Sequence, residues 1–116
     1  MRDHSELTLR NQRDFAKVYK NGKSKGSRFV VVLYRKNNLD FTRTAFVSSK
    51  KVGNSVQRSR SGRLMKEAYR AIESRVKPGY DIIFVARNTI NGHKEPEVQK
   101  TITKVMEDCD LLAKQK

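Results

Sequence analysis

The chain has 116 residues, and 26 Lys and Arg against 12 Asp and Glu give it a formal net charge of +14 at pH 7. Because self-repulsion of this size destabilises a compact protein, the composition indicates a polyanionic partner. The hydrophobic fraction of 36% is gathered in blocks such as residues 29–34 and 80–86, which excludes a disordered chain and predicts a single domain over residues 1–116, with 1–8 and 113–116 flexible.

The first predicted element is a short helix that follows Asn11. This residue suits an N-cap, with Asp14 completing a capping box, and Gly22 is expected to end the helix. Leu7 and Leu9 are expected to anchor the arm that precedes it. The positions i, i+3 and i+4 place three side chains on one face of this helix, namely Phe15, Val18 and Tyr19.

Two strands are expected next. Residues 28–35 are β-branched and aromatic, which is typical of a strand, and residues 42–49 repeat this composition after a turn-rich connection. Since the two segments follow each other closely, we expect them to pair as a hairpin.

A long helix then runs from about residue 55 to 75, with Asn54 or Ser55 as its N-cap, and Pro78 and Gly79 stop it. A buried strand at residues 80–87 and a last helix with Pro96 in its first turn complete the chain. The order α-β-β-α-β-α predicts an α+β sandwich with one layered core.

The long helix is amphipathic on a helical wheel. Its apolar side carries Leu64, Met65, Ala68, Ala71 and Ile72. Its polar side carries Ser59, Arg63, Lys66 and Arg70, with Gly62 also facing away from the core and with Arg58 and Arg60 at the two edges. Lys50, Lys51 and Asn54 lie at its entrance, where a helix N-terminus attracts anions.

Two interpretations of this polar side are open. One is a solvated charged face, as most charge runs are. The other is a phosphate-binding face, which the sequence favours for two reasons. Exposed helices usually mix charges in i, i+4 pairs, whereas here Glu67 is the only acid between residues 50 and 70. Arginine also dominates the first half, and its planar fork suits phosphate.

Aromatic residues flanked by basic ones offer a second candidate site. Phe15, Tyr19 and Tyr34, with Lys17 and Arg28 nearby, would form a stacking platform for unpaired bases, and ordinary core packing is the alternative.

Other chemistry finds little support. Cys109 is the only cysteine, which excludes a disulfide framework or a Cys/His zinc site, so we interpret it as a small residue near the apolar face of the last helix in a reducing, cytoplasmic protein. His4 and His93 are interpreted as solvated loop residues rather than metal ligands. We expect no membrane partner, since apolar stretches are short and the N-terminus lacks a signal-peptide block.

The segments "SSKKVGNSVQRSRSGRLMKEAYR" and "DIIFVARN", preceded by "DFAKVYKNGKS" and "FVVVLY", resemble the protein subunit of bacterial ribonuclease P in order and spacing. The family pattern has a lysine pair, a Val/Ile-Gly turn and a helix with Arg-Asn-Arg followed by Lys-Arg-Leu. Ser59 stands where that pattern has Asn, and Gly62 where it has Lys, whereas Arg58, Arg60 and Arg63 match it.

The resemblance implies a protein monomer that partners a catalytic RNA, which holds the magnesium ions and removes the 5′ leader of precursor tRNA. It implies that the long helix contacts this RNA and that the leader lies near Phe15, Tyr19 and Tyr34, where a shift of one residue would exchange Tyr34 for Leu33. It also implies a ribosomal protein S5 domain 2-like fold, with a small mixed sheet and a left-handed β-α-β crossover.

Three other functions compete with this one, of which a free-standing nuclease is disfavoured because the sequence lacks an acid cluster to hold a metal ion. A structural RNA-binding protein of ribosomal type would share the size and charge, and reconstitution of leader cleavage would distinguish it. A DNA-binding protein is disfavoured, because the basic helix packs one face on a sheet, unlike a helix-turn-helix.

Overall fold

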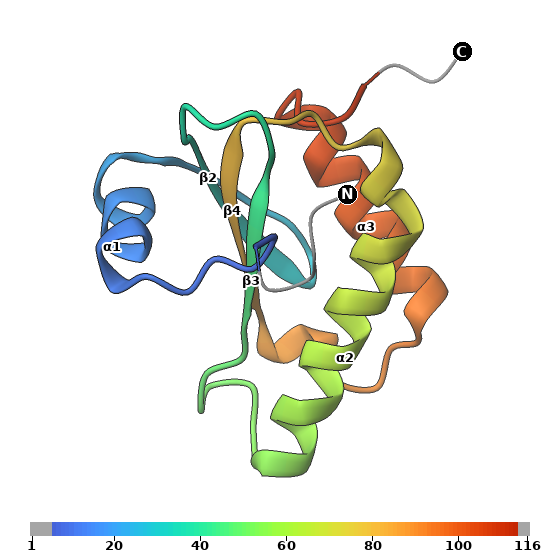
Figure 1. Ribbon diagram of the computed structural model, residues 1–116. Coiled ribbons are helices and arrows are strands. Elements are labelled where there is room, and N and C mark those ends of the chain that lie inside the picture. Colours follow the sequence, from blue (N-terminus) through green and yellow to red (C-terminus); the bar gives the residue numbers. More distant parts are fainter. Residues whose placement is uncertain (1–5, 114–116) are drawn as a thin grey trace.

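The computed structural model describes residues 6–113 and has helices on both faces of one four-stranded sheet (Figure 1). The helices are α1 (Gln12–Asn21), α2 (Ser55–Ile72) and α3 (Glu95–Asp108), and the strands are β1 (Lys23–Gly26), β2 (Val30–Lys36), β3 (Arg43–Val47) and β4 (Tyr80–Ala86). Short 3-10 turns follow α2 (Glu73–Arg75) and β4 (Asn88–Ile90). α1 lies on one side of the sheet, and α2 and α3 lie on the other. The predicted α+β sandwich is confirmed.

The strand order β1-β2-β4-β3 corrects two expectations. β2 forms its hairpin with β1, an unpredicted strand, and β3 pairs with β4 in parallel across α2 rather than with β2. β1 escaped detection because its sequence, KSKG, is exposed throughout and has no apolar alternation. β4 takes the central position because consecutive residues from Asp81 to Phe84 are buried on both faces of the sheet.

The ends of the helices follow local capping signals. At α1 the Asn11 side chain accepts a hydrogen bond from the Arg13 amide at 2.8 Å, but Asp14 pairs with Arg43 instead of completing a capping box. At α2 the box is complete: the Gln57 amide donates to Asn54 Oδ1, and the Asn54 amide donates to Gln57 Oε1, both at 2.9 Å. Asn54 is therefore the N-cap of α2.

Two apolar clusters lie on the two faces of the sheet. The larger one joins the sheet to α2 and α3 through residues such as Met65, Phe84 and Met106. The smaller one lies under α1. It consists of Leu9, Val18, Ala45 and Ile83, with Phe15, Leu33, Val47 and Val85 packed against it. Side chains alternate between the faces along each strand, so neighbouring strand residues belong to different clusters.

The N-terminal arm is fastened to β3. The Leu9 amide donates to the Thr44 carbonyl at 2.8 Å, and the Thr44 amide donates to the Leu7 carbonyl at 2.9 Å. Leu7 and Leu9 thus anchor the arm as expected, whereas the flexibility expected for residues 1–8 stays a prediction. At the other end, the Ala113 amide donates to the Arg75 carbonyl. Residues 1–5 and 114–116, which were also predicted to be flexible, lie outside the described residues, as does His4.

His93 is not the solvated loop residue that was expected. Its ring lies 4.4 Å from that of Phe29, and its Nδ1 bonds to Glu97, which holds the pKa of Glu97 below its usual value. Cys109, half-buried against the larger cluster just after α3, agrees with its expected position.

Candidate nucleic-acid interface

A groove with a volume of about 800 Å³ runs between α2 and the edge strand β3. We call it the α2 groove. It brings together five of the predicted RNA-binding residues: Arg58, Ser59, Arg63, Lys66 and Arg70. Glu67 is the one carboxylate in its lining, and within residues 6–113 no salt bridge joins its four cations to an acid. The groove therefore presents uncompensated positive charge, which suits a phosphate backbone.

Arg58 is the most constrained cation of the α2 groove. It is half-buried, and its Nε is buried without a hydrogen-bond partner in the described part of the chain. A buried donor left unpaired costs free energy, so the fold holds this nitrogen at a cost while the Arg58 side chain lines the groove. Arg58 is thus placed to bind an anion in the groove through its guanidinium group.

Buried Ser61 connects two residues that line the groove, Arg58 and Ser48, a role that sequence reasoning missed. It is 1% exposed, and its Oγ donates to the Arg58 carbonyl at 2.9 Å and shares a hydrogen bond of 2.7 Å with Ser48 Oγ. This contact joins α2 to the end of β3. The available signal was a small polar residue on the apolar side of the helix, which must find a partner when buried.

The side chain of Arg60 lies away from the other predicted RNA-binding cations of α2. Its guanidinium donates to the carbonyl of His93, in the loop before α3, and it does not line the α2 groove. Its prediction as a phosphate ligand therefore lacks geometric support, because its side chain ties α2 to the α3 side of the molecule. The two arginines at the edges of the polar side of α2 thus point to different places. Arg58 lines the α2 groove, and Arg60 bonds to the His93 carbonyl.

The entrance of α2 is cationic and exposed. Lys50, Lys51 and Asn54 are all exposed in the turn that leads into the helix. Gly53 in this turn has φ +144°, and a Cβ there would lie 1.9 Å from Gln57 Oε1, the atom that completes the capping box. Glycine is therefore required at this position, and the two lysines are held next to the helix N-terminus.

A second candidate surface lies where α1 meets the sheet. The Phe15 and Tyr19 rings are 6.5 Å apart and nearly parallel, with an interplanar angle of 23°, and Tyr19 is 52% exposed. Half-buried Leu33, Val47 and Val85 extend the apolar area beside them. We call these five residues the α1 surface. Lys17 is exposed on the same helix.

Tyr34 does not belong to the α1 surface. It packs with Tyr80 and Cys109 against the larger cluster, on the sheet face opposite α1, and Leu33 takes the place expected for it. The one-residue alternative was thus the correct one, because a shift of one residue moves a strand side chain to the other face. Leu33, Val47 and Val85 were missed as site residues, although strand alternation identifies them once the pairing is known.

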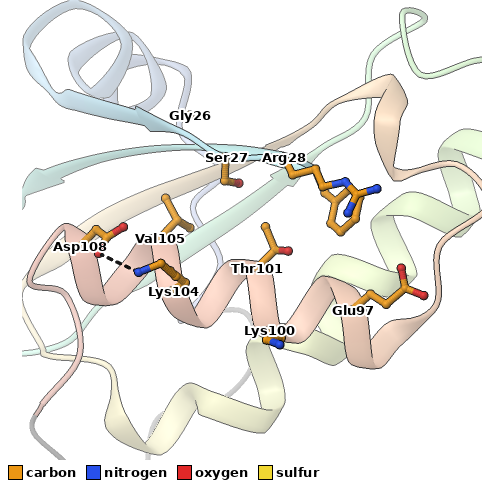
Figure 2. Close-up of a pocket in the computed structure, with 10 residues that line it drawn as sticks. Gly26, Ser27, Arg28, Glu97, Lys100, Thr101, Lys104, Val105 and Asp108 are labelled. Carbon is orange, nitrogen blue, oxygen red and sulfur yellow. Dashed lines mark ion pairs between the residues drawn. The ribbon is translucent and has the colours of Figure 1, made fainter.

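Arg28 also lies away from the α1 surface. Its guanidinium carbon is 4.9 Å from the centre of the Phe29 ring, beside a cavity between the β1–β2 turn and α3 (Figure 2). The other charged residues of this cavity come from α3, and Lys104 pairs with Asp108 across one helical turn at 3.8 Å. The predicted set of aromatic and basic residues therefore splits among three places, and Phe15, Lys17 and Tyr19 stay on α1.

Residues 6–113 show neither a metal centre nor a membrane-spanning helix. They contain no group of three or more His, Cys, Asp or Glu side chains placed to hold a metal ion. Nor does a helix among them have the length and apolar character needed to cross a membrane.

Comparison with known proteins gives consistent results. The model of the ribonuclease P family matches residues 4–110. A ribonuclease P protein component of Alkaliphilus oremlandii is 43% identical over 104 residues, covering 90% of this chain and 91% of that protein. A solved mutant of the Staphylococcus aureus RNase P protein, described as defective in mRNA degradation, superposes with a TM-score of 0.86 at 27% identity, covering 93% of this chain and 92% of the other. The RNase P protein of Thermotoga maritima superposes with a TM-score of 0.79 at 28% identity, covering 87% of this chain and 96% of the other.

Proposed function

Because this chain belongs to the ribonuclease P protein family and acts as the protein component of that enzyme, we propose that its α2 groove binds the catalytic RNA and its α1 surface binds the 5′ leader of precursor tRNA. Both parts of the proposal concern a single protein monomer within the complex, working in the cytoplasm.

The observation that carries the first part is the uncompensated charge of the α2 groove. Arg58, Arg63, Lys66 and Arg70 face one carboxylate, and Arg58 Nε has no protein partner within residues 6–113. Folded RNA presents phosphates at close spacing, and guanidinium groups bind them in two-pronged fashion. Exposed Lys50 and Lys51 extend the contact to the helix entrance, where the helix dipole also favours an anion.

The second part rests on the α1 surface. A single-stranded leader has unstacked bases, and aromatic rings on a protein surface offer them stacking. Tyr19 is exposed enough to accept a base, whereas half-buried Phe15 supports it from one side. Lys17 on the same helix can hold the leader backbone. Tyr34 and Arg28 have no part in this contact, because they lie elsewhere.

The catalytic step is proposed to belong to the RNA subunit, with magnesium held mainly by that RNA. Magnesium takes oxygen ligands, and the α2 groove offers cationic nitrogen atoms and a single carboxylate. The protein's contribution is then electrostatic: a subunit of net charge +14 reduces the repulsion between catalytic RNA and precursor tRNA. Reduced repulsion lowers the magnesium concentration that the assembly needs.

Reconstitution tests this function. Leader cleavage by the catalytic RNA is measured over a magnesium titration, without protein, with this protein, and with the Arg58→Ala/Arg63→Ala variant. The protein should lower the magnesium concentration for half-maximal cleavage, and the variant should do so less. A Lys94→Ala/Lys100→Ala variant, with the same charge change at the N-cap and in the first half of α3, is the matched control and should act as the wild type. Equal effects of both variants would show that bulk charge, not the groove, carries the function.

A further inference from the structure

Four side chains form a two-by-two arrangement at one end of the sheet. Lys23 of β1 lies opposite Tyr34 of β2, and Lys36 of β2 lies opposite Tyr80 of β4. Residues opposite each other, and residues two apart on one strand, share a face of the sheet. All four therefore lie on the face that α2 and α3 cover, which is the face opposite the α1 surface.

A cavity of about 400 Å³ opens at this corner. Asn21 and Gly22 at the end of α1 form one wall, and Cys109 and Asp110 after α3 form another. We call it the tyrosine pocket. Its volume lies within the range of about 300–1,000 Å³ that is usual for sites of small molecules.

The rings of Tyr34 and Tyr80 pack against each other in the pocket. Their ring centres are 6.4 Å apart at an interplanar angle of 62°, and Tyr34 and Cys109 line the pocket together. Burial, with the nearby Cys109 thiol, raises the pKa of Tyr34. Both tyrosines remain half-buried, which leaves part of each ring accessible from the pocket.

The charges around the tyrosine pocket are cationic. Lys23 and Lys36 are exposed in its lining. Asp110 is the one carboxylate of the lining, and its Oδ1 already accepts a hydrogen bond from Lys77 Nζ at 2.8 Å. Aromatic rings between unneutralised cations are the combination that binds a base together with its phosphate.

We propose that the tyrosine pocket binds an unpaired nucleotide of single-stranded RNA, with the base against Tyr34 and Tyr80 and its phosphates on Lys23 and Lys36. The pocket is a separate site from the α1 surface, but it adjoins the end of α1. A Cβ at Gly22 would lie 2.7 Å from the Tyr34 carbonyl oxygen, so α1 ends directly against β2. The same strand, or a second one, therefore reaches the pocket around this edge of the sheet.

Photocross-linking tests the pocket directly. A 12-nucleotide single-stranded RNA containing 5-iodouridine is irradiated with the full-length protein, and the cross-linked peptides are identified by mass spectrometry. Cross-links to Tyr34 or Tyr80 are expected. Lys23→Ala/Lys36→Ala should reduce their yield about fivefold or more, whereas Lys94→Ala/Lys100→Ala should leave it within about twofold, because each lost phosphate contact weakens single-strand binding.

Two substitutions at Tyr34 separate stacking from packing. Tyr34→Phe keeps the ring and should keep the cross-link at Tyr80, whereas Tyr34→Leu keeps apolar bulk without the ring and should lose most of it. If Tyr34→Leu does not fold, the lysine variants still decide. Cross-links confined to peptides of α1 and α2 would overturn the proposal. Equal losses of cross-link yield in Lys23→Ala/Lys36→Ala and Lys94→Ala/Lys100→Ala would also overturn it.

The source of the strand is found by placing 5-iodouridine either in the precursor leader or in the catalytic RNA of the reconstituted enzyme. A cross-link to Tyr34 or Tyr80 in one arm identifies the source and supports the pocket. Normal cleavage with no such cross-link in either arm overturns the pocket and leaves the proposed function intact.

Discussion

Arg43 grips the carboxylate of Asp81 with two hydrogen bonds, from Nε at 2.8 Å and from Nη2 at 2.7 Å. Its Nη1 also reaches Asp14 on α1 at 3.2 Å, so one guanidinium joins α1, β3 and β4. The Asp81 side chain is 5% exposed, and Asn37 donates a further hydrogen bond to it at 3.0 Å. This contact holds the edge strand β3, and with it one wall of the α2 groove, against the centre of the sheet.

Replacing Arg43 with Met should destabilise the protein by about 3 kcal/mol, because it leaves the buried Asp81 carboxylate without its cation. Urea unfolding measures this. The control is Lys77→Met, which breaks an exposed pair with Asp110 and should cost less than about 1 kcal/mol. Equal losses in the two variants would contradict the special role of the Arg43–Asp81 contact.

Arg58 and Arg60 should have different effects although they are two residues apart. Arg58→Ala/Arg63→Ala should leave the fold intact and make RNA binding less dependent on salt. The slope of the logarithm of the binding constant against the logarithm of the salt concentration should fall in magnitude by roughly 0.7–0.9 per lost contact. Arg60→Ala should leave that slope unchanged and lower stability by about 1–2 kcal/mol, because Arg60 bonds the His93 carbonyl. Binding titrations at several salt concentrations and thermal melts separate the two effects, and a slope change with Arg60→Ala would disprove the division.

Gly62→Lys should be tolerated and should tighten binding to the catalytic RNA. A Cβ at Gly62 would meet only Ser48 Oγ, at 3.9 Å, and a residue other than glycine stabilises a helix interior by up to about 1 kcal/mol. Gly53→Ala is the contrasting control, because φ is +144° there and Gln57 occupies the space. It should destabilise the protein, and thermal melts of both variants check the pair. An unfolded Gly62→Lys variant would show that this position is packed more closely than the contacts indicate.

Tyr19→Ala should weaken binding of precursor tRNA to the reconstituted enzyme while leaving mature tRNA nearly unaffected, because only the precursor has a leader to stack on the α1 surface. A lost stack is worth about 1–3 kcal/mol per base. The measured quantity is the ratio of precursor to mature affinity. Leu39→Ala, a change at another exposed apolar residue, is the control. A ratio that stays at the wild-type value would mean that the leader lies elsewhere.

Cys109 should react slowly with iodoacetamide. Burial raises the pKa of its thiol, and the contact with Tyr34 offsets this in part, so less thiolate is present at pH 8 than in the unfolded chain. Since the folded pKa is the higher one, the neutral thiol favours folding below the ordinary thiol pKa, and this contribution is lost as the pH rises through the folded value. Alkylation rates in buffer and in denaturant between pH 7 and 10 test this, and equal rates at pH 8 would contradict it.

The sequence by itself determined the features that depend on neighbouring residues. Capping depends on backbone groups only three residues apart, so the polar residues before α2 placed its N-cap at Asn54 or Ser55, and the hydrogen bonds between Asn54 and Gln57 then decided for Asn54. The spacing of Leu64, Met65 and Ala68 likewise fixed which side of α2 is apolar, and its cationic side followed. The family pattern, carried by the same contiguous residues, was also correct.

Only the tertiary structure decided the contacts between distant segments. β3 pairs with β4 and not β2 because the segment that can be buried on both faces takes the centre of the sheet, and composition does not reveal a partner. That pairing and its register place Leu33 beside α1 and Tyr34 beside Cys109 on the opposite face. In the same way, the side chain of Arg60 turns away from the α2 groove because the loop before α3 brings the His93 carbonyl within its reach. A hydrogen bond between residues 33 positions apart depends on how the whole chain packs, and local periodicity contains no information on it.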